Sequence, residues 1–131
     1  KTFGLLGKAL GTAFQIQDDI LDYEALRLDT GKPALKDFKE GKMTFPLYFA
    51  VKYANRKDKN FIMNNLGQSK ILKKDQNKIY KLIQNDKTQK GVNALLDKYT
   101  KETIKQLDKL KHLACYNEIL ELTTFSRIRT I

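Results

Sequence analysis

Apolar residues recur at helical spacing from the start of the chain, over residues 2–26. They are Phe3, Leu6, Leu10, Ala13, Phe14, Ile20 and Leu21. In the same segment Gly4, Gly7 and Gly11 fall at i, i+3 and i+7, so they share one smooth side of the predicted helix. A glycine inside a helix costs about 1 kcal/mol relative to alanine. Three glycines on one side therefore predict close packing against a neighbouring helix.

Five further segments have helical patterns. They are residues 45–56, 58–66, 75–85, 88–111 and 116–128. Thr44 is the predicted N-cap of the first of these, because Pro46 follows within the first turn, and Asp75 is the predicted cap of the third. The segment 88–111 has its apolar residues on one side. Since no segment of useful length alternates apolar and polar residues, we predict an all-α fold, with residues 1–131 as a single domain.

The net charge of +10 is concentrated in one stretch. Residues 52–111 hold sixteen Lys or Arg against six Asp or Glu, whereas the remainder of the chain is balanced. Such a block is typical of a solvated helical surface. Its aromatic residues lie at spacings expected of a core, which disfavours nucleic acid as a partner. Peripheral contact with an anionic membrane is kept as a hypothesis.

Cys115 is the only cysteine, so an internal disulfide is excluded and a reducing, cytoplasmic compartment is expected. No apolar run approaches the roughly 20 residues of a membrane span. The chain opens at Lys1 with the apolar periodicity already established by Phe3, which predicts a fragment of a longer protein.

Residues 14–23, FQIQDDILDY, carry three carboxylates within an otherwise apolar segment. Gln15, Asp18, Asp19 and Asp22 fall at i, i+3, i+4 and i+7, so they share one side of the helix. Residues 9–26 contain no Lys or Arg, and the compensating charge must come from outside this helix. A buried carboxylate without a partner is too costly to stay ionised. We therefore predict a divalent cation with oxygen ligands, best matched by magnesium; a solvated acidic side is the alternative.

A second unusual segment, TGKPALKDFKEGKMTFP, covers residues 30–46. Glycine and proline flank Lys32, and a glycine precedes Lys42, so both lysines lie on predicted turns, with Asp37 between them. Two lysines beside a carboxylate-bound metal supply the positive charge that a polyphosphate needs. An ordinary surface connection rich in turn residues is the alternative.

Together these two segments resemble the trans-isoprenyl diphosphate synthases, particularly the bacterial polyprenyl type. The resemblance rests on that family's second aspartate-rich region, here GTAFQIQDDILDY, and on its GKP, D, EGK, T and P positions, all within about residues 7–46. It continues less distinctly over the whole chain. It implies an antiparallel helical bundle, the C-terminal part of an isoprenoid synthase fold. The implied reaction condenses an allylic diphosphate with isopentenyl diphosphate and uses magnesium.

The resemblance also implies roles for individual residues. Asp18, Asp19, Asp22 and Lys32 match the family's catalytic positions, and Asp18, Asp22 and Asp37 match its metal ligands or their immediate surroundings. Asp19 would assist the two metal-binding aspartates.

Substrate contacts follow from the same resemblance. Lys32 and Lys42 would hold diphosphate oxygens, and Gln15 would face the growing prenyl chain or its carbocation. Arg129 lies where the family often has basic residues near the isopentenyl site.

The sequence departs from the family pattern in what it lacks. Asp18 and Asp19 form its only adjacent aspartate pair, so the family's first aspartate-rich motif is absent, and we expect the chain to be inactive alone. Leu35 stands where many relatives have a small residue. The nearly all-apolar helix 2–26 needs cover from an N-terminal half, a second polypeptide or further copies, so a homo- or hetero-oligomer is expected. The alternative function is a non-catalytic helical interaction module or a degenerate subunit.

Overall fold

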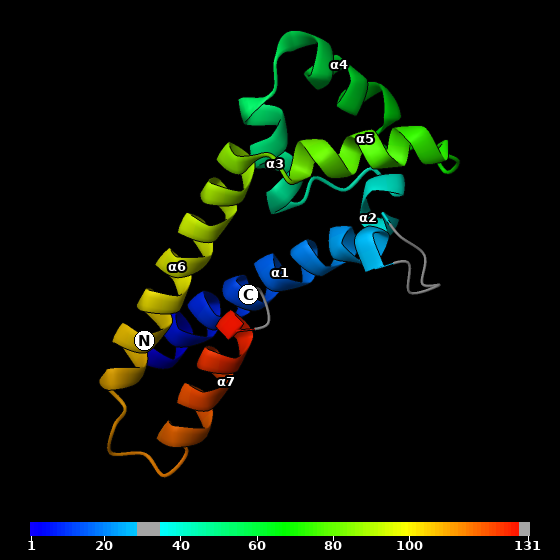
Figure 1. Ribbon diagram of the computed structural model, residues 1–131. Coiled ribbons are helices and arrows are strands. Elements are labelled where there is room, and N and C mark those ends of the chain that lie inside the picture. The colour runs from blue at the N-terminus through cyan, green and yellow to red at the C-terminus, as the bar shows by residue number, and fades with distance from the viewer. Residues whose placement is uncertain (29–34, 129–131) are drawn as a thin grey trace. The chain divides into compact units, whose positions relative to one another are not determined.

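The computed structural model describes residues 1–28 and 35–128. Every regular element in these two ranges is an α-helix, which confirms the all-α prediction (Figure 1). The helices are α1 (Thr2–Leu28), α2 (Lys36–Lys39), α3 (Phe45–Tyr53), α4 (Arg56–Asn65), α5 (Lys73–Ile83), α6 (Asp86–Asp108) and α7 (Tyr116–Ile128). None of the described helices is long and apolar enough to cross a bilayer.

The chain divides into two compact units. The middle unit comprises Asp19–Val92, and the terminal unit comprises Lys1–Asp18 together with Asn93–Ile131. The boundaries fall within α1 and within α6. That residues 1–131 form a single domain stays a prediction.

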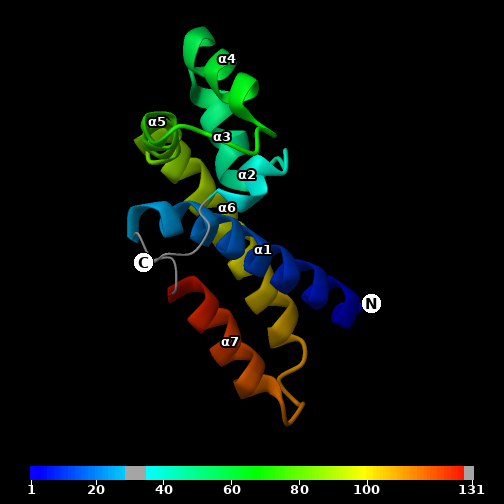
Figure 2. The same cartoon turned by 90° about the vertical axis from the view of Figure 1, so that its right-hand side faces the viewer.

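The middle unit is built around one apolar cluster. Its buried members are Tyr23, Leu35, Phe38, Leu47, Ala50, Ile62, Ile79 and Ile83. Helix α3 contacts both α4 and α5, and Figure 2 shows α5 nearly end-on. Ile79 and Ile83 are four residues apart, so they lie on the same side of α5, and this side faces the core.

The terminal unit has a smaller apolar cluster. Leu6 of α1 packs with Leu107 in the last turn of α6 and with Leu110 just after that helix. Leu113, Tyr116, Ile119 and Leu120 pack against these three residues. Figure 1 shows α7 beside the last turns of α6 and the first turns of α1.

Several predicted helix ends are wrong, and for α4 the reason is a local cap. Helix α4 begins at Arg56, since Asn55 Oδ1 accepts a hydrogen bond from the backbone N–H of Asp58 at 2.8 Å. Asp75 lies in the first turn of α5, and Leu72 occupies the N-cap position. Helix α3 ends at Tyr53, three residues earlier than predicted, and α6 begins and ends earlier than predicted.

Leu35 precedes α2 in the left-handed conformation, with φ of 59°. It is the only described residue other than glycine with a positive φ. This conformation costs a side chain about 1–2 kcal/mol. The Leu35 side chain is 0% exposed within the middle-unit core, and burying a leucine contributes about 1.5–3 kcal/mol. Burial therefore offsets the backbone strain at this turn.

Candidate active site

Asp22 connects α1 to the start of α2. The backbone N–H of Lys36, the first residue of α2, donates a hydrogen bond to Asp22 Oδ1 at 3.2 Å. The left-handed turn at Leu35 comes directly before this N–H. Because the first N–H groups of a helix have no partner within the helix, a carboxylate is a favourable acceptor for them.

Asp19 makes the corresponding contact with α3. The backbone N–H of Phe45, the first residue of α3, donates to Asp19 Oδ2 at 3.2 Å. Pro46 follows it and has no N–H, which leaves Phe45 as a prominent donor at this end of the helix. Asp19 is 3% exposed, so its charge is enclosed as well as hydrogen-bonded.

The carboxylate of Asp22 is only partly satisfied. Its Oδ2 is buried and has no hydrogen-bond partner among the described residues. Burial raises the pKa of Asp22, and the negative charge of Asp37 raises it further. The backbone N–H groups of Lys36 and Asp37 act in the opposite direction, and Asp19 adds a smaller increase. Three carboxylates of the middle unit are thus close enough to influence one another.

Tyr23 holds α1 against the start of α3. Its hydroxyl lies 3.3 Å from Thr44 Oγ1, and both side chains are buried. Burial raises the pKa of Tyr23 well above its ordinary value, so the phenol stays neutral. Thr44 occupies the predicted N-cap position of α3, but its side chain pairs with Tyr23 and makes no capping hydrogen bond.

Lys42 lies on the turn between α2 and α3. Gly41 has a φ of 79°, and the N–H of Lys42 donates to the carbonyl of Asp37 at 2.9 Å. The N–H of Gly67 donates to the carbonyl of Phe38 at 2.9 Å and holds the turn against the end of α4. Lys42 is exposed. The turn therefore presents a cation between the two helices whose first N–H groups bind Asp22 and Asp19.

The other predicted site residues are not all brought together. Asp18 and Gln15 are exposed on α1, in the terminal unit, with Asp18 one helical turn before Asp22. Lys32 and Arg129 fall outside the described residues. Within the described ranges, no group of three or more His, Cys, Asp or Glu side chains is arranged to hold a metal ion. The metal-ligand roles stay predictions.

Sequence reasoning did not find the backbone donors. Asp19 accepts a hydrogen bond from a backbone N–H at the start of α3, and one carboxylate oxygen of Asp22 accepts one at the start of α2. The sequence had predicted a cation as the partner of these carboxylates. One feature of the sequence could have indicated this: Pro46 marks a helix start, and helix starts expose unpaired N–H groups.

The model of the polyprenyl synthetase family matches residues 1–83, which include the contacts of Asp19 and Asp22. The chain belongs to this family. Among curated members, octaprenyl diphosphate synthase of Haemophilus influenzae is 42% identical over 62 residues, 47% of this chain and 19% of that protein. Geranylgeranyl diphosphate synthase of Sulfolobus acidocaldarius is 31% identical over 104 residues, 79% of this chain and 31% of that protein.

A solved structure has the same fold as this chain. The polyprenyl synthase of Roseobacter denitrificans has 25% sequence identity to it, and the two superpose with a TM-score of 0.80 over 98% of this chain. The match covers 41% of the Roseobacter chain. The likeness confirms the predicted isoprenoid synthase fold. The chain spans less than half the length of each of these three relatives.

Proposed function

We propose that this chain is the C-terminal part of a polyprenyl diphosphate synthase, which condenses an allylic diphosphate with isopentenyl diphosphate. It would be inactive without the remainder of the fold. The observation that carries the proposal is the carboxylate of Asp22. Its Oδ2 is buried without a hydrogen-bond partner among the described residues, and the negative charge of Asp37 lies nearby. Membership of the polyprenyl synthetase family supports the same reading.

Magnesium would suit the paired carboxylates of Asp22 and Asp37. Repulsion between Asp22 and Asp37 and the unpartnered Oδ2 are both relieved by a hard cation, and magnesium commonly takes one or two carboxylates along with phosphate oxygens. Asp22 and Asp37 would hold it. Asp18, one helical turn before Asp22, would add a further oxygen only after its side chain moves, because no three carboxylates of the described residues are grouped around a metal position. The bound ion would supply positive charge that neutralises a diphosphate leaving group.

The remaining residues would bind and position the substrates. Lys42, exposed on its turn, and Lys32 would bind diphosphate oxygens, where preorganised positive charge stabilises the departing pyrophosphate. Gln15 would face the prenyl chain, and Arg129 would contact isopentenyl diphosphate. Asp19 already accepts the N–H of Phe45, which favours a positioning role for it at the start of α3.

The proposal extends to the surroundings of the chain. An N-terminal half, a second polypeptide or further copies would complete the fold as a homo- or hetero-oligomer, in a cytoplasmic compartment. Peripheral membrane contact through the basic stretch 52–111 is a separate part of the proposal and does not depend on the diphosphate chemistry.

One observation favours the alternative, a non-catalytic helical interaction module or degenerate subunit. Asp19 and Asp22 both bind the first N–H groups of helices, so the acidic side of α1 has a structural use that requires no metal. This reading predicts that magnesium and diphosphate have no effect on the chain.

Thermal unfolding with magnesium and inorganic pyrophosphate tests the proposal, with the chain alone and with a supplied N-terminal part of a family member. We expect Tm to rise only when magnesium and pyrophosphate are both present. Asp22→Asn should abolish this rise, whereas Glu121→Gln, which changes an exposed acid of α7, should not affect it. Turnover of allylic diphosphate in the completed enzyme should follow the same pattern. An unchanged Tm in both preparations would refute the proposal.

A further inference from the structure

The positive charge of the middle unit is concentrated on its later helices. Residues 52–92 hold eleven Lys or Arg against three Asp or Glu, a net charge of +8. Most of the net charge of the whole chain therefore belongs to this one compact unit. The stretch comprises part of α3, all of α4 and α5, and the start of α6.

Helix α5 carries exposed lysines on the sides that do not face the core. Ile79 and Ile83 face the core, Lys74 and Lys81 lie on the opposite side of the helix, and exposed Lys73 lies on the flank between the two. Lys74 and Lys81 are seven residues apart, about two helical turns, so their side chains point in nearly the same direction. Asp75, the only acid of α5, is partly buried between the two sides.

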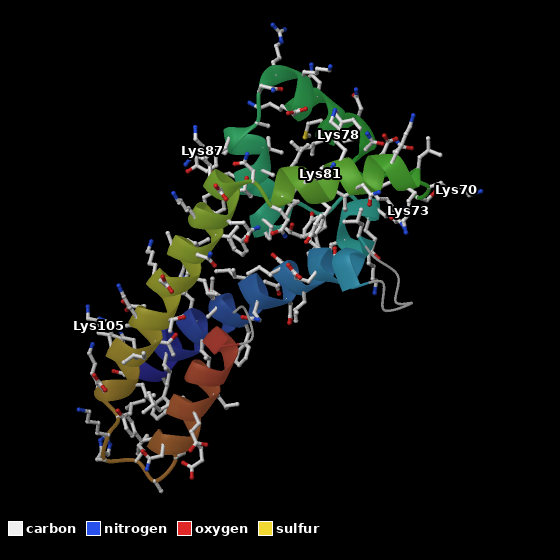
Figure 3. The ribbon with its side chains drawn as sticks, in the orientation of Figure 1. Lys70, Lys73, Lys78, Lys81, Lys87 and Lys105 are labelled. Carbon is white, nitrogen blue, oxygen red and sulfur yellow. The ribbon has the colours of Figure 1, made fainter. Side chains whose placement is uncertain are left out.

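The turn before α5 adds further exposed residues to these lysines. Lys70 is exposed there, and Figure 3 shows it reaching away from the ribbon beyond the N-terminal end of α5. Leu72, at the N-cap position, is 64% exposed although it is apolar. Lys70, Leu72, Lys73, Lys74 and Lys81 are called the basic face below.

Lys78 differs from the lysines of the basic face because its charge has partners within the middle unit. Its Nζ lies 3.6 Å from Asp58 Oδ1 and 4.2 Å from the centre of the Phe61 ring, so its charge is used in joining α5 to α4. No lysine of the basic face forms an ion pair with another described residue. Their charge is free to attract an external anionic surface.

The basic face could bind two kinds of large anionic partner, a lipid bilayer or a nucleic acid. The exposed side chain of Leu72 favours the bilayer. An apolar side chain among lysines is typical of contact with a bilayer, where lysines reach the headgroups and the leucine enters the interface. Single-stranded nucleic acid is bound largely by stacking bases on exposed aromatic rings. The rings of α5 and of Phe61 do not offer this, since Lys78 covers Phe61 and Tyr80 is partly buried. The exposed rings of the middle unit, Tyr48 and Tyr53, belong to α3 and not to the basic face.

We propose that the basic face docks this chain on an anionic lipid bilayer, with Leu72 inserted at the interface. Neighbouring Ile71 packs against the middle-unit core, so Leu72 is held on a structured turn and does not lose that packing when it inserts. The proposal narrows the membrane contact to the exposed residues of α5 and of the turn before it. It stands whether or not the chain takes part in diphosphate chemistry.

Co-sedimentation with lipid vesicles tests this directly and needs no enzymatic activity. The chain should bind vesicles of phosphatidylcholine mixed with phosphatidylglycerol and should not bind phosphatidylcholine alone. A lysine near an anionic surface strengthens binding about fivefold. Replacing Lys73, Lys74 and Lys81 by glutamine should weaken binding on the order of 100-fold. Leu72→Ser should weaken it about tenfold, with little dependence on salt.

The matched control removes the same charge elsewhere. Lys98, Lys101 and Lys105 are exposed on α6, in the terminal unit, and their replacement by glutamine should leave vesicle affinity within about threefold of the unmodified chain. Circular dichroism melting checks that both triple variants keep the fold.

Three results would overturn the proposal. Equal weakening by the two triple variants would show that net charge alone attracts the chain. Equal binding to neutral vesicles would remove the electrostatic basis. A single-stranded oligonucleotide that binds more tightly than vesicles, and depends on Lys73, Lys74 and Lys81, would identify nucleic acid as the partner of this face.

Discussion

The backbone N–H of Lys36 donates a hydrogen bond to Asp22 Oδ1 at 3.2 Å, joining α1 to the first turn of α2. The second carboxylate oxygen, Oδ2, is buried without a partner among the described residues. The two oxygens of one side chain thus have different surroundings. One stabilises the fold, and the other is available to a ligand.

The raised pKa of Asp22 predicts a pH dependence of stability. Burial and the charge of Asp37 hold its folded-state pKa above the ordinary 3.8, so ionisation is less favourable in the folded than in the unfolded chain. Folding free energy is therefore lost as the pH rises through the folded-state pKa. Without magnesium, Asp22→Asn should therefore gain stability relative to the unmodified chain as the pH rises from below 3.8 towards neutral.

Urea denaturation of both proteins across this pH range measures the difference. A stability difference that shrinks as the pH rises would contradict the raised pKa. Magnesium with pyrophosphate should reverse the order, because only the unmodified chain keeps the proposed ligand.

Replacement of Asp19 should destabilise the start of α3. Asp19→Ala removes the acceptor of the Phe45 N–H in a site that is 3% exposed, and an unpaired buried donor costs about 1–3 kcal/mol. Asp19→Asn keeps an acceptor and should cost less. Chemical denaturation gives both values; equal losses would mean that the hydrogen bond to Phe45 contributes nothing measurable.

The hydroxyl pair of Tyr23 and Thr44 should behave as a coupled unit. The two oxygens lie 3.3 Å apart in a buried setting. Tyr23→Phe and Thr44→Val should each lower the free energy of unfolding by about 0.5–1.5 kcal/mol. The double variant should lose less than the sum, which a double-mutant cycle measures. Strictly additive losses would show that the two hydroxyls do not interact.

Leu35 should respond unusually to substitution, because it combines full burial with a φ of 59°. Leu35→Ala keeps the backbone strain and empties part of the core, at a cost of about 2–5 kcal/mol. Leu35→Gly also loses the core contact but removes the strain. We expect the glycine variant to be as stable as the alanine variant or more stable, by up to about 1 kcal/mol. A clearly more stable alanine variant, as at an ordinary helical position, would contradict the strain.

Most helices were predictable because their causes are local. Apolar spacing predicted α1 and α7 closely, and the spacing of Gln15, Asp18, Asp19 and Asp22 on one helical side follows from the helix repeat alone. Helix starts were less predictable. Asn55 caps α4, and the left-handed turn at Leu35 depends on burial in a core that forms from distant segments.

The lack of a cation around the carboxylates of α1 within their own helix can be read from the sequence, and the motifs there resemble the family to which the chain belongs. What those carboxylates contact depends on how distant segments pack. The donors to Asp22 and Asp19 lie 14 and 26 residues further along the chain. They are backbone N–H groups, which every residue except proline carries, so no residue type marks them. Their availability arises when α2 and α3 begin beside α1, because only the first N–H groups of a helix are left without a partner inside it.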